Sequence, residues 1–317
     1  MKNRKKTTRG SLVRWWLAST VVLFPATALA AGTPDLSPWW AWPLALFLLC
    51  LVLGILAVPA GIGGGVLFVP IVSGFFPFHL DFVRGAGLLV ALASALAAGP
   101  TLLRAGLADL RLALPLAVMA SLGAIAGALF GLALPAAVIE AALGVAILCI
   151  AAVMWRERKS DYPDVARPDP LGAALRISGV FHDPAAGRNV AWRVHRTPLG
   201  LALFAGIGMM AGVFGLGAGW ANVPALNLVM GVPLKVSAGT SGLILSVADS
   251  AAAWIYLHDG ALLAIVAVPS VVGMMLGAVI GTRLLERSRA SAIRGLVVVL
   301  LVLAGVRALA KGVGWWS

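Results

Sequence analysis

Apolar residues run along this chain in long continuous blocks, without the short alternations typical of soluble helices and strands. A helix crosses the roughly 30 Å of bilayer hydrocarbon with about 20 residues, and several blocks have about this length. We therefore predict that each of these blocks is one membrane-spanning helix. They cover residues 85–103, 112–133, 134–155, 236–257, 261–282 and 295–310.

Two further blocks, 43–77 and 198–234, are longer and contain both glycine and proline. As a single helix, about 35 residues would measure roughly 52 Å at 1.5 Å per residue. That is too long for one crossing and too short for two full crossings with a turn. We predict that each block is a hairpin of two short or broken segments, whose open backbone must be covered by protein or line a cavity.

The Lys and Arg residues between the blocks predict which loops face the cytoplasm, because basic loops stay on that side. The segment 156–197 carries eight of them, 283–294 carries four and 104–111 carries two. The loops 134–136 and 258–260 carry none. All five fall on the expected side if the chain starts outside and each long block counts as two crossings. Each half then has five segments, so the second half has the opposite orientation to the first.

Glycine motifs recur in both halves in the same order, which indicates an internal duplication. Residues 61–70 (GIGGGVLFVP) align with residues 215–224 (GLGAGWANVP) at an offset of 154. Glycines spaced four apart on one helical face form a further pair of motifs, and we expect these ladders to pack helices closely. The ladders are Gly123, Gly127 and Gly131 in the first half and Gly273, Gly277 and Gly281 in the second.

The fold class that follows is an all-α polytopic membrane protein made of two inverted-topology repeats with broken Gly/Pro hairpin segments. Residues 1–30 are a signal peptide or an N-terminal anchor, because a basic stretch precedes a short apolar run and a small-x-small site. Residues 31–155 form the first membrane repeat and 198–317 the second. The segment 156–197 is a cytoplasmic linker, in which alternating apolar and polar residues around 183–187 indicate a β-hairpin.

Composition and charge exclude the main soluble classes. Hydrophobic residues make up 61% of the 317 residues and charged ones 11%, against about 45–50% and 25% in ordinary globular domains. The net charge of +12 gathers at the ends of apolar blocks, as topology signals do, so no nucleic-acid partner is expected. Arg307 and Lys311 are the exception to the charge rule, because they fall at the end that the topology places outside.

Two motifs are formally those of enzymes, but each lacks a required partner. Neither glycine run is followed by the Lys-Ser/Thr of a nucleotide-binding loop. Residues 239–242 (GTSG) match a motif of intramembrane serine proteases, which need a base within hydrogen-bond reach of the serine. The nearest histidine, His258, lies about 25 Å further along the same segment if it is helical. We therefore expect no enzymatic activity, no cofactor and no metal.

The matched glycine runs are the candidate substrate site. Transporters with inverted repeats bind substrate near the midplane, where Gly/Pro-interrupted segments occupy matching positions in both halves; close helix packing is the alternative use of such glycines. We expect the prolines to mark the breaks, because proline lacks a backbone donor. The predicted substrate-binding residues are Gly61, Gly63, Gly64, Gly65, Pro70, Gly215, Gly217, Gly219, Asn222, Pro224, Thr240 and Ser241.

Charged residues are rare inside the predicted spans. Only Asp249 lies deep in one, where a carboxylate costs about 2.5–3.5 kcal/mol. It is a candidate for proton or cation coupling, and a structural hydrogen bond is the alternative. No Lys or Arg lies deep in a predicted span, since Arg84 falls in the loop 78–84. We therefore expect backbone N–H groups to hold an anion, with Lys235 attracting anions at the mouth of the second hairpin.

Three stretches of the chain resemble the sulfite exporter TauE/SafE family. They are residues 61–70, 215–226 and 231–241, and the resemblance extends over roughly residues 43–310. It implies a duplicated secondary transporter of the bacterial inner membrane that moves sulfite, organosulfonates or related small anions.

We therefore predict a multi-pass inner-membrane transporter of a small oxyanion, such as sulfite or a sulfonate. Export is the predicted direction, since an inside-negative potential favours outward movement of a monoanion by about 2.3 kcal/mol per 100 mV. The alternative function is a non-transporting membrane scaffold or assembly factor. The expected partners are a small anionic substrate and the lipid bilayer, and assembly into a homo-oligomer is left open.

Single cysteines test this topology in a chain whose Cys50 and Cys149 have been replaced. Position 176 is predicted to be cytoplasmic and position 259 to be outside. An impermeant thiol reagent added to intact cells should label Asp259→Cys but not Arg176→Cys, and permeabilised cells, as the control, should show both labelled. Labelling of both positions in intact cells, or of position 176 alone, would contradict the inverted topology.

Overall fold

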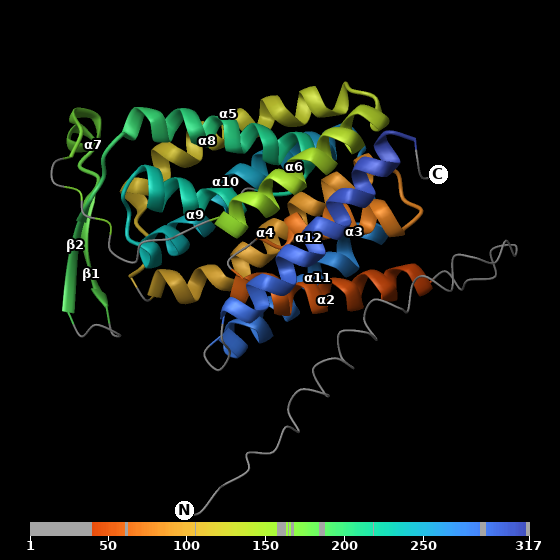
Figure 1. The fold of residues 1–317 in the computed structure, drawn as a ribbon, viewed down its shortest axis with the longest axis horizontal. Coiled ribbons are helices and arrows are strands. Elements are labelled where there is room, and N and C mark those ends of the chain that lie inside the picture. Colours follow the sequence, from red (N-terminus) through yellow and green to blue (C-terminus); the bar gives the residue numbers. More distant parts are fainter. Residues whose placement is uncertain are drawn as a thin grey trace, which may run out of the picture. The chain divides into compact units, whose positions relative to one another are not determined.

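The computed structural model describes residues 40–60, 63–104, 106–156, 163, 165, 168–183, 188–217, 219–285 and 290–314. The predicted signal peptide or anchor, residues 1–30, lies outside this part. The elements described here belong to one compact unit, Trp42–Ser317, apart from the first residue of α2. In chain order they are α2 (Ala41–Ala60), α3 (Gly65–Phe75), α4 (Leu80–Arg104), α5 (Leu110–Leu132), α6 (Ala136–Arg156), α7 (Pro170–Ala174), β1 (Ser178–Asp183), β2 (Arg188–Arg193), α8 (Thr197–Phe214), α9 (Gly219–Pro224), the π-helical turn η1 (Ala225–Val229), α10 (Leu234–His258), α11 (Ala264–Leu285) and α12 (Ala290–Gly312) (Figure 1).

Long apolar helices dominate this part of the chain. Six of the described helices are long and apolar enough to cross a bilayer, namely α4, α5, α6, α8, α10 and α11, and α2 and α3 contain shorter apolar stretches. Every block predicted to be a single span corresponds to one helix, with ends shifted by a few residues. The prediction of a polytopic helical membrane protein is thus confirmed.

Each of the two long blocks contains a break at its glycines. In the first block, α2 ends at Ala60 and α3 begins at Gly65. In the second, α8 ends at Phe214, and Gly215 and Gly217 have φ angles of +68° and +69° before α9 begins. Glycine adopts this left-handed conformation without the steric cost that a Cβ brings, so it can end a helix abruptly.

The two prolines of the glycine motifs lie inside helical turns, so the prediction that they mark the breaks is wrong. Pro70 is the sixth residue of α3, and Pro224 is the last residue of α9 and has α-helical angles. Each proline removes one backbone donor, a loss that membrane helices tolerate when neighbouring groups compensate. After Pro224 the helix continues in the wider π-helical turn η1, a common local adjustment.

The glycine ladders lie where helices from opposite halves touch. A Cβ on Gly127 would collide with the backbone of Met209 in α8, and a Cβ on Gly277 would collide with the backbone of Leu51 in α2. Thus α5 packs on α8 and α11 packs on α2, at distances that leave no room for a side chain. The prediction that these ladders pack helices closely is confirmed.

The buried apolar side chains form two large clusters and a small one. The first cluster draws mainly on α2, α3, α6, α11 and α12, and the second on α5, α8, α10 and the linker. Helix α4 contributes to both, with Val83 in the first and Leu88 in the second. The small cluster consists of Ala91, Ala211 and Leu245, and so joins α4, α8 and α10.

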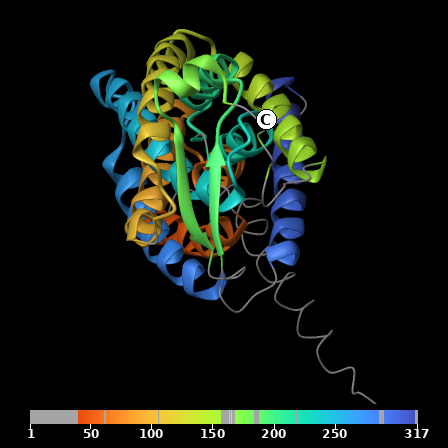
Figure 2. The same cartoon turned by 90° about the vertical axis from the view of Figure 1, so that its left-hand side faces the viewer.

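The linker forms the antiparallel β-ribbon that its alternating pattern predicts. Strands β1 and β2 pair with Val180 opposite Ala191, and the ribbon lies across one end of the helices (Figures 1 and 2). Phe181 and Trp192 are buried in the second cluster. Residues 184–187 of the predicted turn lie outside the described part, and the side of the membrane on which the ribbon lies remains a prediction.

Two cations of α12 bind the C-terminal end of α3. Arg307 Nε donates to the Gly74 carbonyl at 2.8 Å, and Lys311 Nζ donates to the Ser73 carbonyl at 3.2 Å. Lys311 also pairs with Glu140 at 2.8 Å. Because the last carbonyls of a helix carry a partial negative charge, these contacts give a structural reason for the two cations that depart from the loop-charge rule.

Substitution of ladder glycines tests the helix packing. Gly127→Leu should lower the melting temperature of the purified protein in detergent, because overpacking a tight contact costs about 1–3 kcal/mol or more. Gly206→Leu, on the open side of α8 where no atom lies within 4 Å of the added Cβ, should melt like the wild type. Equal melting temperatures for the two variants would show that α5 and α8 do not pack in this way.

Candidate functional site

The two glycine breaks lie against each other inside the helical unit. A Cβ built on Gly219 would be 2.8 Å from the backbone nitrogen of Gly63, and one built on Gly65 would be 2.5 Å from the carbonyl oxygen of Leu216. The start of α3 therefore touches the segment before α9, and the start of α9 touches the segment before α3. We call this contact of residues 63–65 with residues 215–219 the glycine crossing.

Helices α4 and α10 flank the glycine crossing. A Cβ on Gly217 would be 2.6 Å from the Cβ of Ala91 in α4 and 3.0 Å from Oδ2 of Asp249 in α10. Ser241, Leu245 and Asp249 are spaced four residues apart, so they share one face of α10. Since Leu245 and Asp249 both lie next to Gly217, this face of α10 is the one turned toward the crossing.

Ser94 of α4 binds the backbone where α3 begins. The Gly64 N–H donates to Ser94 Oγ at 3.4 Å, and Ser94 Oγ donates to the Ala91 carbonyl at 2.7 Å. Sequence reasoning missed this residue, although the predicted duplication offers a signal. At an offset of 152, which aligns residues 86–87 (AG) with residues 238–239 (AG), Ser94 corresponds to Ser246, which donates in the same way to the Leu243 carbonyl.

Two buried polar side chains near the crossing have no hydrogen-bond partner among the described residues. Asp249 lies beside Gly217 with both carboxylate oxygens unpartnered, and Asn222, one turn into α9, has its amide oxygen and nitrogen unpartnered. Both side chains are fully buried. A buried polar group without a partner costs about 1–3 kcal/mol, and native proteins leave few of them. Such groups beside open helix starts are suited to a ligand or a proton.

The structure separates Thr240 from the glycine crossing. Its Oγ1 accepts a hydrogen bond from the Asp109 N–H at 3.2 Å, and the Asp109 carboxylate in turn accepts one from the Leu112 N–H at the start of α5. Nine residues separate Thr240 from Asp249, or about 13.5 Å along the helix. Its position thus does not support the prediction that Thr240 binds substrate at the crossing; its hydroxyl instead holds the loop between α4 and α5.

The other predicted residues occupy different positions around the crossing. Lys235 is exposed at the second position of α10, about 21 Å from Asp249 along the helix, which suits attraction rather than binding. Pro70 and Pro224 lie one turn or more beyond the starts of their helices. Gly61 lies outside the described residues. No group of three or more His, Cys, Asp or Glu side chains placed to hold a metal occurs in the part of the chain that the structure describes.

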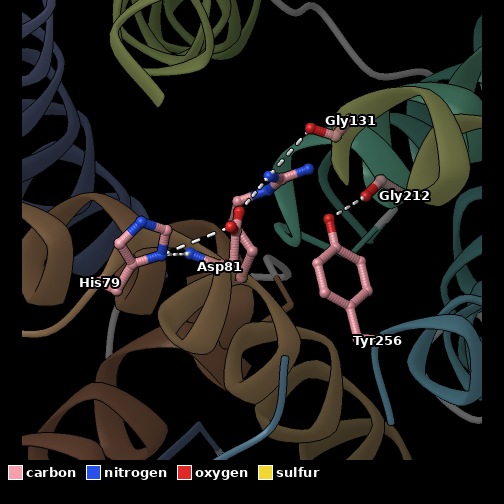
Figure 3. Close-up of polar contacts among 6 residues, drawn as sticks. His79, Asp81, Gly131, Gly212 and Tyr256 are labelled. Atoms are coloured by element: carbon pink, nitrogen blue, oxygen red, sulfur yellow. Dashed lines mark hydrogen bonds and ion pairs between the residues drawn. The ribbon is translucent and has the colours of Figure 1, made fainter. Parts of the chain in front are cut away.

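Arg84 is a buried cation that the sequence analysis placed in a loop. Helix α4 begins at Leu80, so Arg84 lies in its second turn, and only 1% of the side chain is exposed. Its Nη1 donates to Asp81 Oδ1 at 2.7 Å and to the Gly131 carbonyl at 3.3 Å, and its guanidinium carbon lies 5.2 Å from the centre of the Tyr256 ring. Figure 3 shows this group of contacts. The assignment of Arg84 to the loop 78–84 is therefore wrong, although its place in the second turn of α4 is near the start of that helix; the Asp81–Arg84 spacing of i, i+3 was the available signal.

These features define a class of protein: a multi-pass helical membrane protein in which two broken helices meet beside unpaired buried polar groups. The family model of the sulfite exporter TauE/SafE matches residues 46–308. The chain therefore belongs to the sulfite exporter TauE/SafE family, which confirms the resemblance seen in the sequence. This is a family of membrane transporters and not of enzymes. No curated protein and no solved structure matches the chain.

Proposed function

We propose that this protein is a secondary transporter that exports a small oxyanion, such as sulfite or a sulfonate, across the bacterial inner membrane. The observation that carries the proposal is the glycine crossing, where the starts of α3 and α9 meet beside the unpaired side chains of Asn222 and Asp249. Family membership supports the anion class of the substrate. The membrane potential supports export, because it drives a monoanion outward without a coupling ion.

Neutral donors would hold the anion at the crossing. Backbone N–H groups at a helix start carry roughly half a positive charge and bind oxyanions readily. Glycine leaves this backbone without a covering side chain: the nearest atom to a Cβ built on Gly63 lies 3.7 Å away, an ordinary van der Waals contact. The unpartnered Nδ2 of Asn222 is a further donor, whereas Ser241 shares the α10 face turned toward the crossing but lies about 12 Å along the helix from Asp249.

The proposed transport cycle uses two inverted repeats. Helix α5 packs on α8 as α11 packs on α2, and α10 packs on α5 as α4 packs on α11. In the predicted repeats α2 corresponds to α8, α4 to α10 and α5 to α11. Replacing each helix by its counterpart turns the first contact of each of these two comparisons into the second. Such an exchange supports a pseudo-twofold axis through the crossing, the arrangement in which alternating access occurs around a fixed midplane site.

Asp249 would control the charge of this site. Its carboxylate lies beside Gly217, so in its ionised form it would repel an oxyanion at the crossing. A proton on Asp249 removes the repulsion and adds a donor. If the proton enters and leaves with each anion, Asp249 is the coupling residue of the cycle.

A membrane scaffold or assembly factor is the second candidate function. Close packing through glycine would serve a scaffold equally well. The unpaired Asn222 and Asp249 favour the transporter, because a static protein would gain stability by replacing them with apolar side chains.

Uptake into proteoliposomes tests the proposed function and the proposed site. The wild type should transport sulfite or another anion from a panel of sulfite, sulfate, methanesulfonate, acetate and chloride. Gly63→Ala should reduce this rate by about tenfold, because a methyl group in the anion's approach misplaces the bound ion. Alanine should fit at position 63, where all contacts are 3.7 Å or longer, whereas Gly217 has a positive φ that makes any substitution there strain the backbone.

Gly242→Ala is the matched control for Gly63→Ala. It adds the same methyl group to α10 at a position with no atom within 4 Å of the new Cβ, and it should transport like the wild type. Absence of transport for every anion in the panel would reject the transporter. Normal transport by Gly63→Ala at equal reconstitution would mean that the glycine crossing only packs helices.

The pH dependence of transport tests the role of Asp249. Wild-type uptake should fall as the pH on both sides rises, because loss of the proton leaves a negative charge beside the anion. Asp249→Asn keeps the shape and removes the ionisation, so its uptake should persist and vary little with pH. Parallel pH profiles for the two proteins would show that Asp249 does not sense the anion, and an unchanged response of the variant to an imposed pH gradient would exclude it as the coupling residue.

A further inference from the structure

Arg84 has one edge of its guanidinium unused. A guanidinium has five N–H groups, and those on Nη1 face Asp81 and the Gly131 carbonyl. Nε and Nη2 are buried and have no hydrogen-bond partner within the described residues. The Nε–Nη2 edge is suited to two parallel hydrogen bonds with the oxygens of a carboxylate, phosphate or similar oxyanion. The unsatisfied groups therefore have the geometry of an oxyanion receptor.

Asp81 already places one oxyanion on this guanidinium. Its carboxylate pairs with Nη1 at 2.7 Å, and its side chain is 31% exposed where that of Arg84 is 1% exposed. His79, more exposed still, lies 3.4 Å from the other carboxylate oxygen. Asp81 is thus the more exposed member of the pair, so an anion that approaches from the surface meets the Asp81 charge first.

The surroundings of the guanidinium favour a compact anion. The Tyr256 ring lies 5.2 Å from the guanidinium carbon, and the Tyr256 hydroxyl donates a hydrogen bond to the Gly212 carbonyl. Gly131 lies directly against Nη2, where any side chain would collide with the guanidinium. A small oxyanion fits such a setting better than a bulky one, and a buried arginine is less costly to dehydrate than a lysine.

The same helix connects Arg84 to the glycine crossing. A Cβ on Gly215 would be 2.5 Å from Cα of Arg84, and Ala91 lies beside Gly217. Seven residues separate Arg84 from Ala91, or about 10.5 Å along α4. Arg84 therefore lies beside Gly215, and about 10.5 Å of α4 separates it from Ala91, which lies beside Gly217.

We propose that Arg84 is a second oxyanion-binding site on the route to the glycine crossing, and that Asp81 competes with the anion for its guanidinium. The anion is held by Nε and Nη2, while the Asp81 carboxylate on Nη1 offsets the guanidinium charge, repels the anion and so favours its release toward the crossing. This inference rests on the proposed transport function and adds to it a second site, a cationic donor and an internal competitor.

Variants of the pair should change the apparent KM for sulfite in opposite directions. Arg84→Met should raise it by about tenfold or more, because a charged bidentate partner is lost. Asp81→Asn should lower it several-fold, because the competing charge is gone. Arg84→Lys keeps the positive charge but cannot form two parallel hydrogen bonds, so its apparent KM should lie between those of Arg84→Met and the wild type.

Two controls separate this site from a structural ion pair. Arg111→Met removes the same charge from an exposed position and should leave KM unchanged. Tyr256→Phe removes the bond to Gly212 while the ring under Arg84 stays, and it too should leave KM near the wild-type value. If Arg84→Met and Asp81→Asn instead impair transport in the same direction, or leave KM unchanged, Arg84 is structural and the proposal is overturned.

A binding measurement distinguishes failure of this inference from failure of the proposed function. Sulfite should raise the melting temperature of the wild type in detergent without added phospholipid, raise that of Asp81→Asn at lower concentration, and leave Arg84→Met unaffected. If the melting-temperature shifts follow this order but proteoliposomes show no transport, the anion site is retained and the transporter is rejected. If phospholipid vesicles produce this order of melting-temperature shifts and sulfite does not, the site binds a lipid headgroup phosphate and the proposal is overturned. Equal melting-temperature shifts in all three proteins would also overturn it.

Discussion

A helix that breaks inside an apolar environment exposes backbone groups that lipid cannot satisfy, and this protein has two such breaks. It places each against the other, so that the starts of α3 and α9 lie within contact distance. Only glycine allows backbones to approach this closely. The positions of α4 and α10 follow, because one supplies Ser94 to the first break and the other lines the second.

The polar groups of the interior are organised around this contact. Asp249 lies at the crossing without a partner among the described residues, whereas Arg84 lies about two turns of α4 away from Ala91, which lines the crossing, and is half paired by Asp81. Opposite charges are thus kept apart by helix geometry rather than joined in one buried salt bridge. Nearer the end of the helices, Arg307 and Lys311 bind the terminal carbonyls of α3. The outer charges therefore stabilise the fold, whereas the inner ones are those that we propose to act on the anion.

Much of the fold could be predicted from hydrophobic length and loop charge alone, because helix spans in a bilayer are set by those two quantities. The glycine ladders were also predictable, since regular spacing puts small residues on one face. The positions of the helix breaks relative to the prolines were not predictable. Pro70 lies within a helix because its lost donor is tolerated there, and the second break instead uses the positive φ angles of Gly215 and Gly217.

The candidate site was harder to predict because it depends on which face of a helix meets which neighbour. Thr240 and Ser241 are adjacent in sequence, yet Thr240 faces the loop before α5 and Ser241 shares the face of Asp249. Arg84 was assigned to a loop because a cation normally ends a span. Its charge is accepted inside α4 because Asp81 and the Tyr256 ring lie beside it, and the latter contact joins residues far apart in the chain.

The exchange of ladder partners between the halves has a consequence for biosynthesis. Helix α5 leaves the ribosome long before α8, and α2 long before α11, yet these are the helices whose backbones pack on each other. The first half therefore enters the membrane with the ladder face of α5 and the facing side of α2 without their partners. These two contacts form only after insertion of the first half, by at least the time that translation of α8 and α11 takes.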